Sequence, residues 1–251
     1  MPSSRTRHER IPTRNQTGWT SNRLNEVSRA FVEYCRRVEW PVLDIGAAYG
    51  IATLPALAAG ASVIANDLDA GHLEVLASRC AREHRGRLVR VSGRFPRHLH
   101  FAEASLGAVH ASNVLHFLTG PQLENGVASI AHWLAPGGRV FIQASTPWQK
   151  PWTRFVPVFE QRRAAGAAWP GWMEDTREHS DHGKLTQIPK SIHLLDDATV
   201  QRVLTAAGLE IERCWLYRRE DLPASLYYDG RECVGVIAVK AAVRVRDDRA
   251  E

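Results

Sequence analysis

The run VLDIGAAYG, Val42 to Gly50, places an aspartate and two glycines directly after an apolar segment. Gly46 and Gly50 permit a tight turn and let a ligand approach backbone N–H groups where a helix begins. Asp44 puts a carboxylate beside that turn, which suits a cationic amino group and would repel a pyrophosphate. A dinucleotide-binding turn would also read Gly-x-Gly-x-x-Gly, whereas the spacing here is Gly46-x-Ala48-x-Gly50.

A second carboxylate, Asp67, ends the next apolar run, SVIAND. An acid at the end of the second strand of such a unit accepts hydrogen bonds from the hydroxyls of a ribose. One acid suited to an amino group and another suited to a ribose together predict a ligand that is a nucleoside carrying an amino acid. S-adenosylmethionine has both parts.

Four motifs in order resemble those of the class I S-adenosylmethionine-dependent methyltransferases. VLDIGAAYG resembles the first motif of this family, with Ala48 where the middle glycine usually stands, and NDLD (Asn66 to Asp69) resembles the second. ASNVLHFL, from Ala111, and LAPGGRVFI, from Leu134, resemble the segments that follow strand four and lead into strand five. The resemblance covers Val42 to Ile142.

This resemblance implies a Rossmann-like, doubly wound α/β fold with a mostly parallel seven-stranded sheet, and S-adenosylmethionine as the cofactor. It also implies a cofactor site built from Asp44, Gly46, Ala47, Ala48, Gly50, Asp67, Leu68, Arg94, Phe95 and Asn113. The chain departs from the family where strand three usually ends in Gly-Asp, because Gly93-Arg94-Phe95 stands there. Adenine recognition at that place is therefore expected from the backbone or from stacking on Phe95.

The alternation of elements predicts how the chain is divided. Residues 1–20 are predicted to be a flexible basic arm, and apolar spacing predicts a helix over 21–37. From 40 to 144, strand-like runs alternate with helical patterns, which predicts the cofactor-binding core with a parallel sheet covered on both faces. The alternation stops over 145–195, a segment expected to form an inserted cap. A last helix, capped by Asp196, and the final strands are expected over 196–243, so that 21–251 forms one methyltransferase domain.

The predicted cap holds half of the tryptophans of the chain: Trp148, Trp152, Trp169 and Trp172. Clustered in an irregular segment, these side chains are expected to line an apolar or aromatic substrate pocket, and their alternative role is packing in a core. The cap also contains Glu178-His179-Ser180-Asp181-His182, whose loose ligand spacing we interpret as a solvated loop, so no metal site is expected.

Methyl transfer requires alignment of the two reactants and, for some acceptors, removal of a proton. His116 follows the fourth strand, at the edge of the sheet beside the methyl group, and is the candidate general base. A histidine that simply packs in the fold remains the alternative. His179, His182 or His193 of the cap could serve as the base instead.

The net charge of +5 and the pI of about 9.3 invite a polyanionic partner. Residues 1–30, however, hold six arginines against two glutamates, and the remaining residues carry only +1. We therefore expect a small-molecule acceptor, no nucleic acid and no membrane, and a monomer or homodimer. The polar N-terminus has no apolar core of a signal peptide, and a cytoplasmic location is expected.

Two alternative functions remain open from the sequence. The basic arm suggests an RNA or protein methyltransferase, although the Asn-Pro-Pro-Tyr type of signature is replaced by Ala111-Ser112-Asn113-Val114. The departure at Arg94 leaves room for a cyclase or binding protein that keeps the fold without transferring a methyl group. A nicotinamide-dependent oxidoreductase is disfavoured by the glycine spacing.

Overall fold

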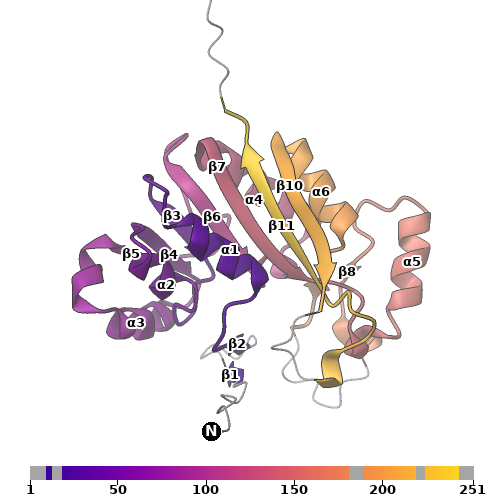
Figure 1. Ribbon diagram of the computed structural model, residues 1–251. Helices are drawn as coiled ribbons and strands as arrows, with labels where there is room; N and C mark the ends of the chain where they lie inside the picture. Colours follow the sequence, from indigo (N-terminus) through magenta and orange to yellow (C-terminus); the bar gives the residue numbers. More distant parts are fainter. Residues whose placement is uncertain (1–9, 13–18, 181–188, 219–223, 243–251) are drawn as a thin grey trace, which may run out of the picture.

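The computed structural model describes residues 10–12, 19–180, 189–218 and 224–242. Its centre is a seven-stranded sheet in the order β10-β11-β7-β6-β3-β4-β5 (Figure 1). All strands run parallel except β11, which is antiparallel to both of its neighbours. The bounds are β3 (Val42–Ile45), β4 (Val63–Asp67), β5 (Leu88–Ser92), β6 (Leu106–Ser112), β7 (Leu134–Ser145), β10 (Leu209–Tyr217) and β11 (Cys233–Lys240). The predicted Rossmann-like, mostly parallel sheet is confirmed.

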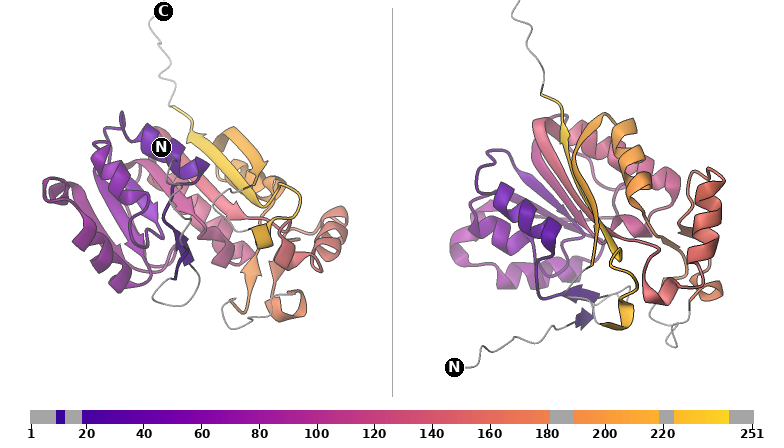
Figure 2. Two further views of the ribbon diagram at one scale, coloured as in Figure 1. Left: turned by 60° about the horizontal axis from the view of Figure 1, so that its bottom comes forward. Right: turned by 45° about the vertical axis from the view of Figure 1, so that its right-hand side comes forward.

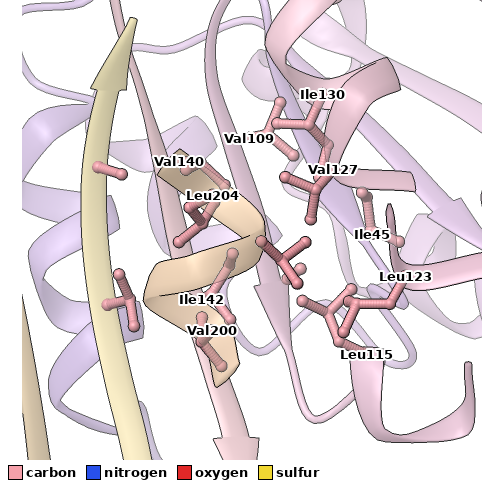
Figure 3. Close-up of a cluster of buried hydrophobic side chains, with 14 of the residues drawn as sticks. Ile45, Val109, Leu115, Leu123, Val127, Ile130, Val140, Ile142, Val200 and Leu204 are labelled. Atoms are coloured by element: carbon pink, nitrogen blue, oxygen red, sulfur yellow. The ribbon is translucent and has the colours of Figure 1, made fainter. Parts of the chain in front are cut away.

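Helices cover both faces of the sheet (Figures 1 and 2). Alternate side chains of the strands pack on α1 (Glu26–Tyr34), α2 (Thr53–Ala58) and α3 (Ala70–Arg79) on one face. The opposite face packs on α4 (Gly120–Trp133) and α6 (Asp197–Ala206). Figure 3 shows this second layer, in which Leu123, Val127 and Ile130 of α4 lie over Ile45 and Val109. Because both faces are buried, the central strands are continuous apolar runs.

Side-chain caps define where several helices begin. Asn25 accepts a hydrogen bond from the backbone N–H of Ser28 at the start of α1, and Asp69 accepts one from Gly71 at the start of α3. The expected cap at Asp196 is present, since its Oδ1 accepts from the N–H of Thr199 at 2.9 Å. Each cap satisfies an N–H that has no partner within its helix.

The segment between β7 and α6 forms a separate small unit beside β10 (Figure 1). It contains α5 (Val156–Ala164), a two-stranded antiparallel ribbon of β8 (Trp172–Met173) and β9 (Ile192–His193), and the 3₁₀ turns η3 (Lys150–Trp152) and η4 (Thr176–Glu178). We call the described parts of this unit, residues 146–180 and 189–194, the cap. The N–H of Leu195 donates to the carbonyl of Ser145 at 2.9 Å, so the chain leaves the sheet and returns to it at one point.

Remaining elements are short. Within the predicted flexible arm, β1 (Arg10–Pro12) and β2 (Trp19–Ser21) pair as antiparallel strands, an element that the sequence analysis did not anticipate. Among the described residues, the further 3₁₀ turns are η1 (Arg82–Arg87), η2 (Leu115–Phe117) and η6 (Ala224–Leu226). In the described part of the chain, no helix has the length and apolar character needed to span a membrane.

Candidate functional site at the carboxyl ends of the central strands

The predicted glycine turn joins β3 to α2. Gly46, Ala48 and Gly50 all have positive φ, at 69°, 44° and 82°. A Cβ on Gly46 would lie 2.3 Å from Cγ2 of Val114, so glycine is required there for space as well as conformation. Ala48 takes a left-handed conformation that costs about 1–2 kcal/mol for a residue with a side chain. The turn is thus a constrained backbone loop at the carboxyl end of the central strand β3.

Asp67 at the end of β4 is hydrogen-bonded to this turn. Its Oδ2 accepts from the N–H of Ala48 at 2.9 Å, and its Oδ1 accepts from the N–H of Asp69 and from Nδ1 of His72 at 2.9 and 3.0 Å. The carboxylate is 7% exposed. A carboxylate oxygen accepts about two hydrogen bonds, so one acceptor position of Oδ2 is left among the described residues. That position suits one ribose hydroxyl, whereas the sequence analysis expected two.

Asp44 lies in a sealed polar cluster. Its Oδ2 accepts from the hydroxyl of Thr53 at 2.6 Å, and its Oδ1 accepts from Nδ1 of His110 at 2.7 Å. The register of β3 on β6 sets Asp44 beside His110. Asp44 is 2% exposed and lies in β3, two residues before Gly46 of the turn.

The residues expected to surround adenine differ in their exposure to solvent. Leu68, directly after β4, is half exposed. Arg94 is exposed and lies near the end of β4, because the N–H of the preceding Gly93 donates to the carbonyl of Asp67. Phe95, in contrast, is buried in the core, edge-on to Trp133. This placement does not suit the stacking on adenine that the sequence suggested, because the ring face is covered by protein.

Asn113 follows β6 with a φ of 58° and is hydrogen-bonded to Gln143 of the neighbouring strand β7, which in turn bonds Tyr217 of β10. Nε2 of Gln143 donates to Oδ1 of Asn113 at 3.0 Å, and the hydroxyl of Tyr217 is hydrogen-bonded to Oε1 of Gln143. Gln143 is fully buried and Tyr217 nearly so. This network fixes the Asn113 amide at the carboxyl end of β6, across the turn from Gly46.

Two histidines lie at the junction of the sheet and the cap. His116 lies on η2, is 8% exposed and contacts Phe117 edge-on at 4.3 Å. His193 on β9 is fully buried and donates its Nδ1–H to the carbonyl of Leu118 at 3.1 Å. Burial lowers the pKa of His193 from 6.5 to about 4, and the bond to Leu118 opposes this shift. His193 is therefore neutral at pH 7, and its Nε2 has no hydrogen-bond partner among the described residues.

The four cap tryptophans separate into two pairs. Trp148 and Trp152 are 1% and 6% exposed and form a core of the cap with Phe155, Phe159 and Met173. Their position fits the core-packing alternative rather than a pocket wall.

Trp169 and Trp172 lie against His193 instead, edge-on with ring centroids 5.2 and 5.8 Å away. Trp169 also covers the backbone of Gly120 at the start of α4, and the guanidinium of Arg202 lies 4.6 Å above its ring. This second pair borders the junction of sheet and cap at β9 and the start of α4.

Several polar residues of the site were not identified from the sequence: Thr53, His72, His110, Gln143 and Tyr217. A buried strand that contains a polar residue is the signal that could have revealed His110 and Gln143, since such residues require a partner. No group of three or more metal-ligating side chains occurs in the described ranges, and Asp181 and His182 lie outside them.

Comparisons with known proteins agree with this geometry. A family model described as a methyltransferase domain matches residues 42–138, while a search of curated protein sequences gives no match. The solved glycopeptide N-methyltransferase MtfA is 20% identical, covers 84% of this chain and 88% of its own, and has a TM-score of 0.56.

Two further solved structures resemble the chain. An S-adenosylmethionine-dependent methyltransferase from Mesorhizobium loti is 17% identical, covering 86% of this chain and 98% of its own, with a TM-score of 0.60. One from Methanosarcina mazei is 15% identical, covering 88% and 99%, with a TM-score of 0.64. The chain thus contains a methyltransferase domain at residues 42–138 and has the fold of the class I S-adenosylmethionine-dependent methyltransferases, which confirms the resemblance drawn from its motifs.

Proposed function

We propose that this S-adenosylmethionine-dependent methyltransferase acts on an oxygen atom, with nitrogen as the second choice, of a small-molecule metabolite bound under the cap. The donor half of this proposal is supported above all by the turn at Gly46 to Gly50, where three successive alternate residues have positive φ and Asp67 is bonded to the backbone of the middle one. A solved structure of MtfA is complexed with (S)-adenosyl-L-methionine, which supports the same donor here.

The residues at the carboxyl ends of β3, β4 and β6 have the chemistry that this donor requires. We propose that Asp67 accepts a ribose hydroxyl, that the half-exposed Leu68 covers adenine, and that the backbone at Arg94 borders it. The turn with Ala47 and Ala48 would contact the amino-acid end, and Asn113 would lie near the transferred methyl. When bound, S-adenosylmethionine supplies an electrophilic methyl group on a sulfonium, whose transfer leaves a neutral thioether.

For an acceptor hydroxyl, the enzyme must also receive a proton as the new bond to carbon forms. We propose His116 for this role, because it lies on η2 directly after β6. His193 is the weaker candidate, since a nitrogen whose pKa is lowered to about 4 takes up a proton poorly at pH 7. Trp169 and Trp172 would then border the acceptor at the junction of sheet and cap.

Two measurements test the proposal. Calorimetric titration with S-adenosylhomocysteine should give saturable binding, and mass spectrometry of metabolite pools incubated with protein and donor should detect a product heavier by one methyl group. Absence of binding would contradict the donor assignment. Binding without a product in any pool would favour the non-methylating alternative, a cyclase or binding protein.

One observation favours a second candidate acceptor, an RNA. Residues 79–97 contain seven arginines and one glutamate, a net charge of +6 against +5 for the whole chain, so the body of the protein is not evenly neutral. These residues form η1, the edge strand β5 and the loop beside Asp67, and Arg82, Arg94 and Arg97 are exposed. An RNA acceptor requires binding that weakens steeply with salt, which anisotropy of a labelled single-stranded RNA would detect.

A further inference from the structure

Helix α1 reaches the acid of the glycine turn through two buried hydrogen bonds. Oγ of Ser28, on the first turn of α1, lies 3.0 Å from Nε2 of His110, and Nδ1 of His110 lies 2.7 Å from Oδ1 of Asp44. The three residues are 4%, 3% and 2% exposed. Phe31, one turn further along α1, stacks on the imidazole with ring centroids 4.8 Å apart.

One assignment of the hydrogens satisfies every polar atom of this chain of residues. An ionised Asp44 accepts only, so in this assignment Nδ1 of His110 carries a hydrogen and donates it. The described residues offer the Ser28 hydroxyl no other partner than Nε2 of His110, and a hydroxyl that donates to Nε2 requires that this nitrogen carry no hydrogen. In this assignment a neutral imidazole joins the Ser28 hydroxyl to the Asp44 carboxylate.

The sequence Ser28–His110–Asp44 is also the order of side chains in a hydrolase triad. A nucleophile must be reached by its substrate, and Ser28 is 4% exposed under α1, with its own N–H bonded to Asn25. The imidazole face is covered by Phe31. The arrangement therefore positions a group and does not attack one.

We propose that His110 is a positioning residue for the methyl donor: it holds the ionised Asp44 carboxylate toward the donor's ammonium group, and Ser28 of α1 keeps the imidazole neutral. This inference rests on the proposed function, since it needs the amino-acid end of S-adenosylmethionine at the turn. Asp44 is 2% exposed between Thr53 and His110, so its carboxylate acts on the ammonium group through its charge, from the carboxyl end of β3, and not by direct contact. Helix α1 is thereby part of the donor site.

Paired substitutions of His110 separate the two bonds. His110→Asn places an amide N–H where Nδ1 lies and keeps the hydrogen bond to Asp44. In His110→Gln the amide lies further out, toward Ser28, and the hydrogen bond to Asp44 is lost. We expect His110→Asn to bind S-adenosylhomocysteine within about threefold of wild type, and His110→Gln to bind at least about tenfold more weakly, the usual loss for a bond to a charged group. Ser28→Ala should weaken binding by about threefold.

A second ligand distinguishes positioning from a general loss of structure. Methylthioadenosine has the same nucleoside and thioether but no amino-acid end, so its affinity should be equal in wild type and all three variants. Equal weakening of both ligands in His110→Gln would overturn the proposal. His132→Asn and Ser129→Ala on the outer side of α4 are matched controls and should leave both affinities unchanged.

The outcomes also separate this inference from the proposed function. If wild-type protein binds neither ligand, the donor assignment itself fails. If wild type binds S-adenosylhomocysteine and His110→Gln binds it equally well while remaining folded by circular dichroism, only the role of His110 fails. If His110→Gln does not fold, Ser28→Ala provides the test. Its affinity for S-adenosylhomocysteine must fall while its affinity for methylthioadenosine stays that of wild type.

Discussion

The buried His193 makes a measurable prediction about stability and pH. His193 has no exposed surface, and its ring packs against Trp169 and Trp172. Desolvation lowers its pKa from 6.5 to about 4. Above pH 6.5 the residue is neutral in both the folded and the unfolded chain. As the pH falls through 6.5 the unfolded chain takes up a proton that the folded protein accepts only near pH 4, so folding stability is lost over this interval.

The size of the loss follows from the same interval. At about 1.4 kcal/mol for each pH unit, the span from 6.5 to about 4 corresponds to about 3 kcal/mol. His193→Asn removes the titrating group and keeps an N–H that can donate to the carbonyl of Leu118. Its free energy of unfolding relative to wild type should therefore rise by about 3 kcal/mol between pH 7.5 and pH 4.

Urea unfolding followed by circular dichroism, at several pH values between 4 and 7.5, measures this difference. Other acid-sensitive groups are common to both proteins and cancel in the comparison. The exposed His132 on α4 supplies the control, and His132→Asn should follow the wild-type pH profile. A constant difference between His193→Asn and wild type across the whole range would refute the reasoning.

Four further predictions concern the glycine turn, Asp67 and the cap. Gly46→Ala should cost about 2–4 kcal/mol of stability in thermal unfolding, because it combines a left-handed conformation with a steric overlap. Ala48→Gly should change stability by less than about 1 kcal/mol, because the relief of the left-handed conformation is offset by the greater conformational entropy of glycine in the unfolded chain. Asp67→Asn should weaken S-adenosylhomocysteine binding by at least about tenfold in calorimetry, since the amide nitrogen cannot accept the N–H bonds that the carboxylate holds. Trp148→Ala should cost about 3–5 kcal/mol in urea unfolding as a core residue. Trp40→Ala, at a half-exposed position, is its comparison and should cost clearly less, because about half of that side chain is already in contact with water. An undisturbed Trp148→Ala protein, or equal effects of the two alanine–glycine exchanges, would contradict these assignments.

The sheet could be predicted from the sequence because local signals agreed with one another. Apolar runs, glycine turns and helix caps such as Asp196 recur in an order that only a parallel α/β sheet accommodates, and the structure contains them at the expected places. The turn from Gly46 to Gly50 was recognisable for the same reason. Its positive φ angles are local properties of the backbone, and the glycines at these positions indicate them directly.

Side-chain neighbours could not be predicted in this way. That His110 lies beside Asp44 depends on the register between β3 and β6, which a one-residue slip would change. For a related reason, the sequence could not distinguish a core role from a ligand-binding role for Phe95 and the cap tryptophans. An aromatic residue near a strand end suits a core as well as a ligand surface. Only the packing of α4 on Phe95, and of α5 on Trp148, distinguishes the two.

The bond between Leu195 and Ser145 has a consequence for how such enzymes diversify. Because the cap departs and returns at adjacent backbone atoms and carries its own core, it can be lengthened, exchanged or lost in evolution while the sheet keeps its register. On the proposal that the acceptor binds under the cap, new acceptor preferences can then arise by replacement of one contiguous stretch of gene. On the same proposal, a chimaera that joins this sheet to the corresponding insert of a structural relative would keep the donor site of this chain and take the acceptor preference of the relative.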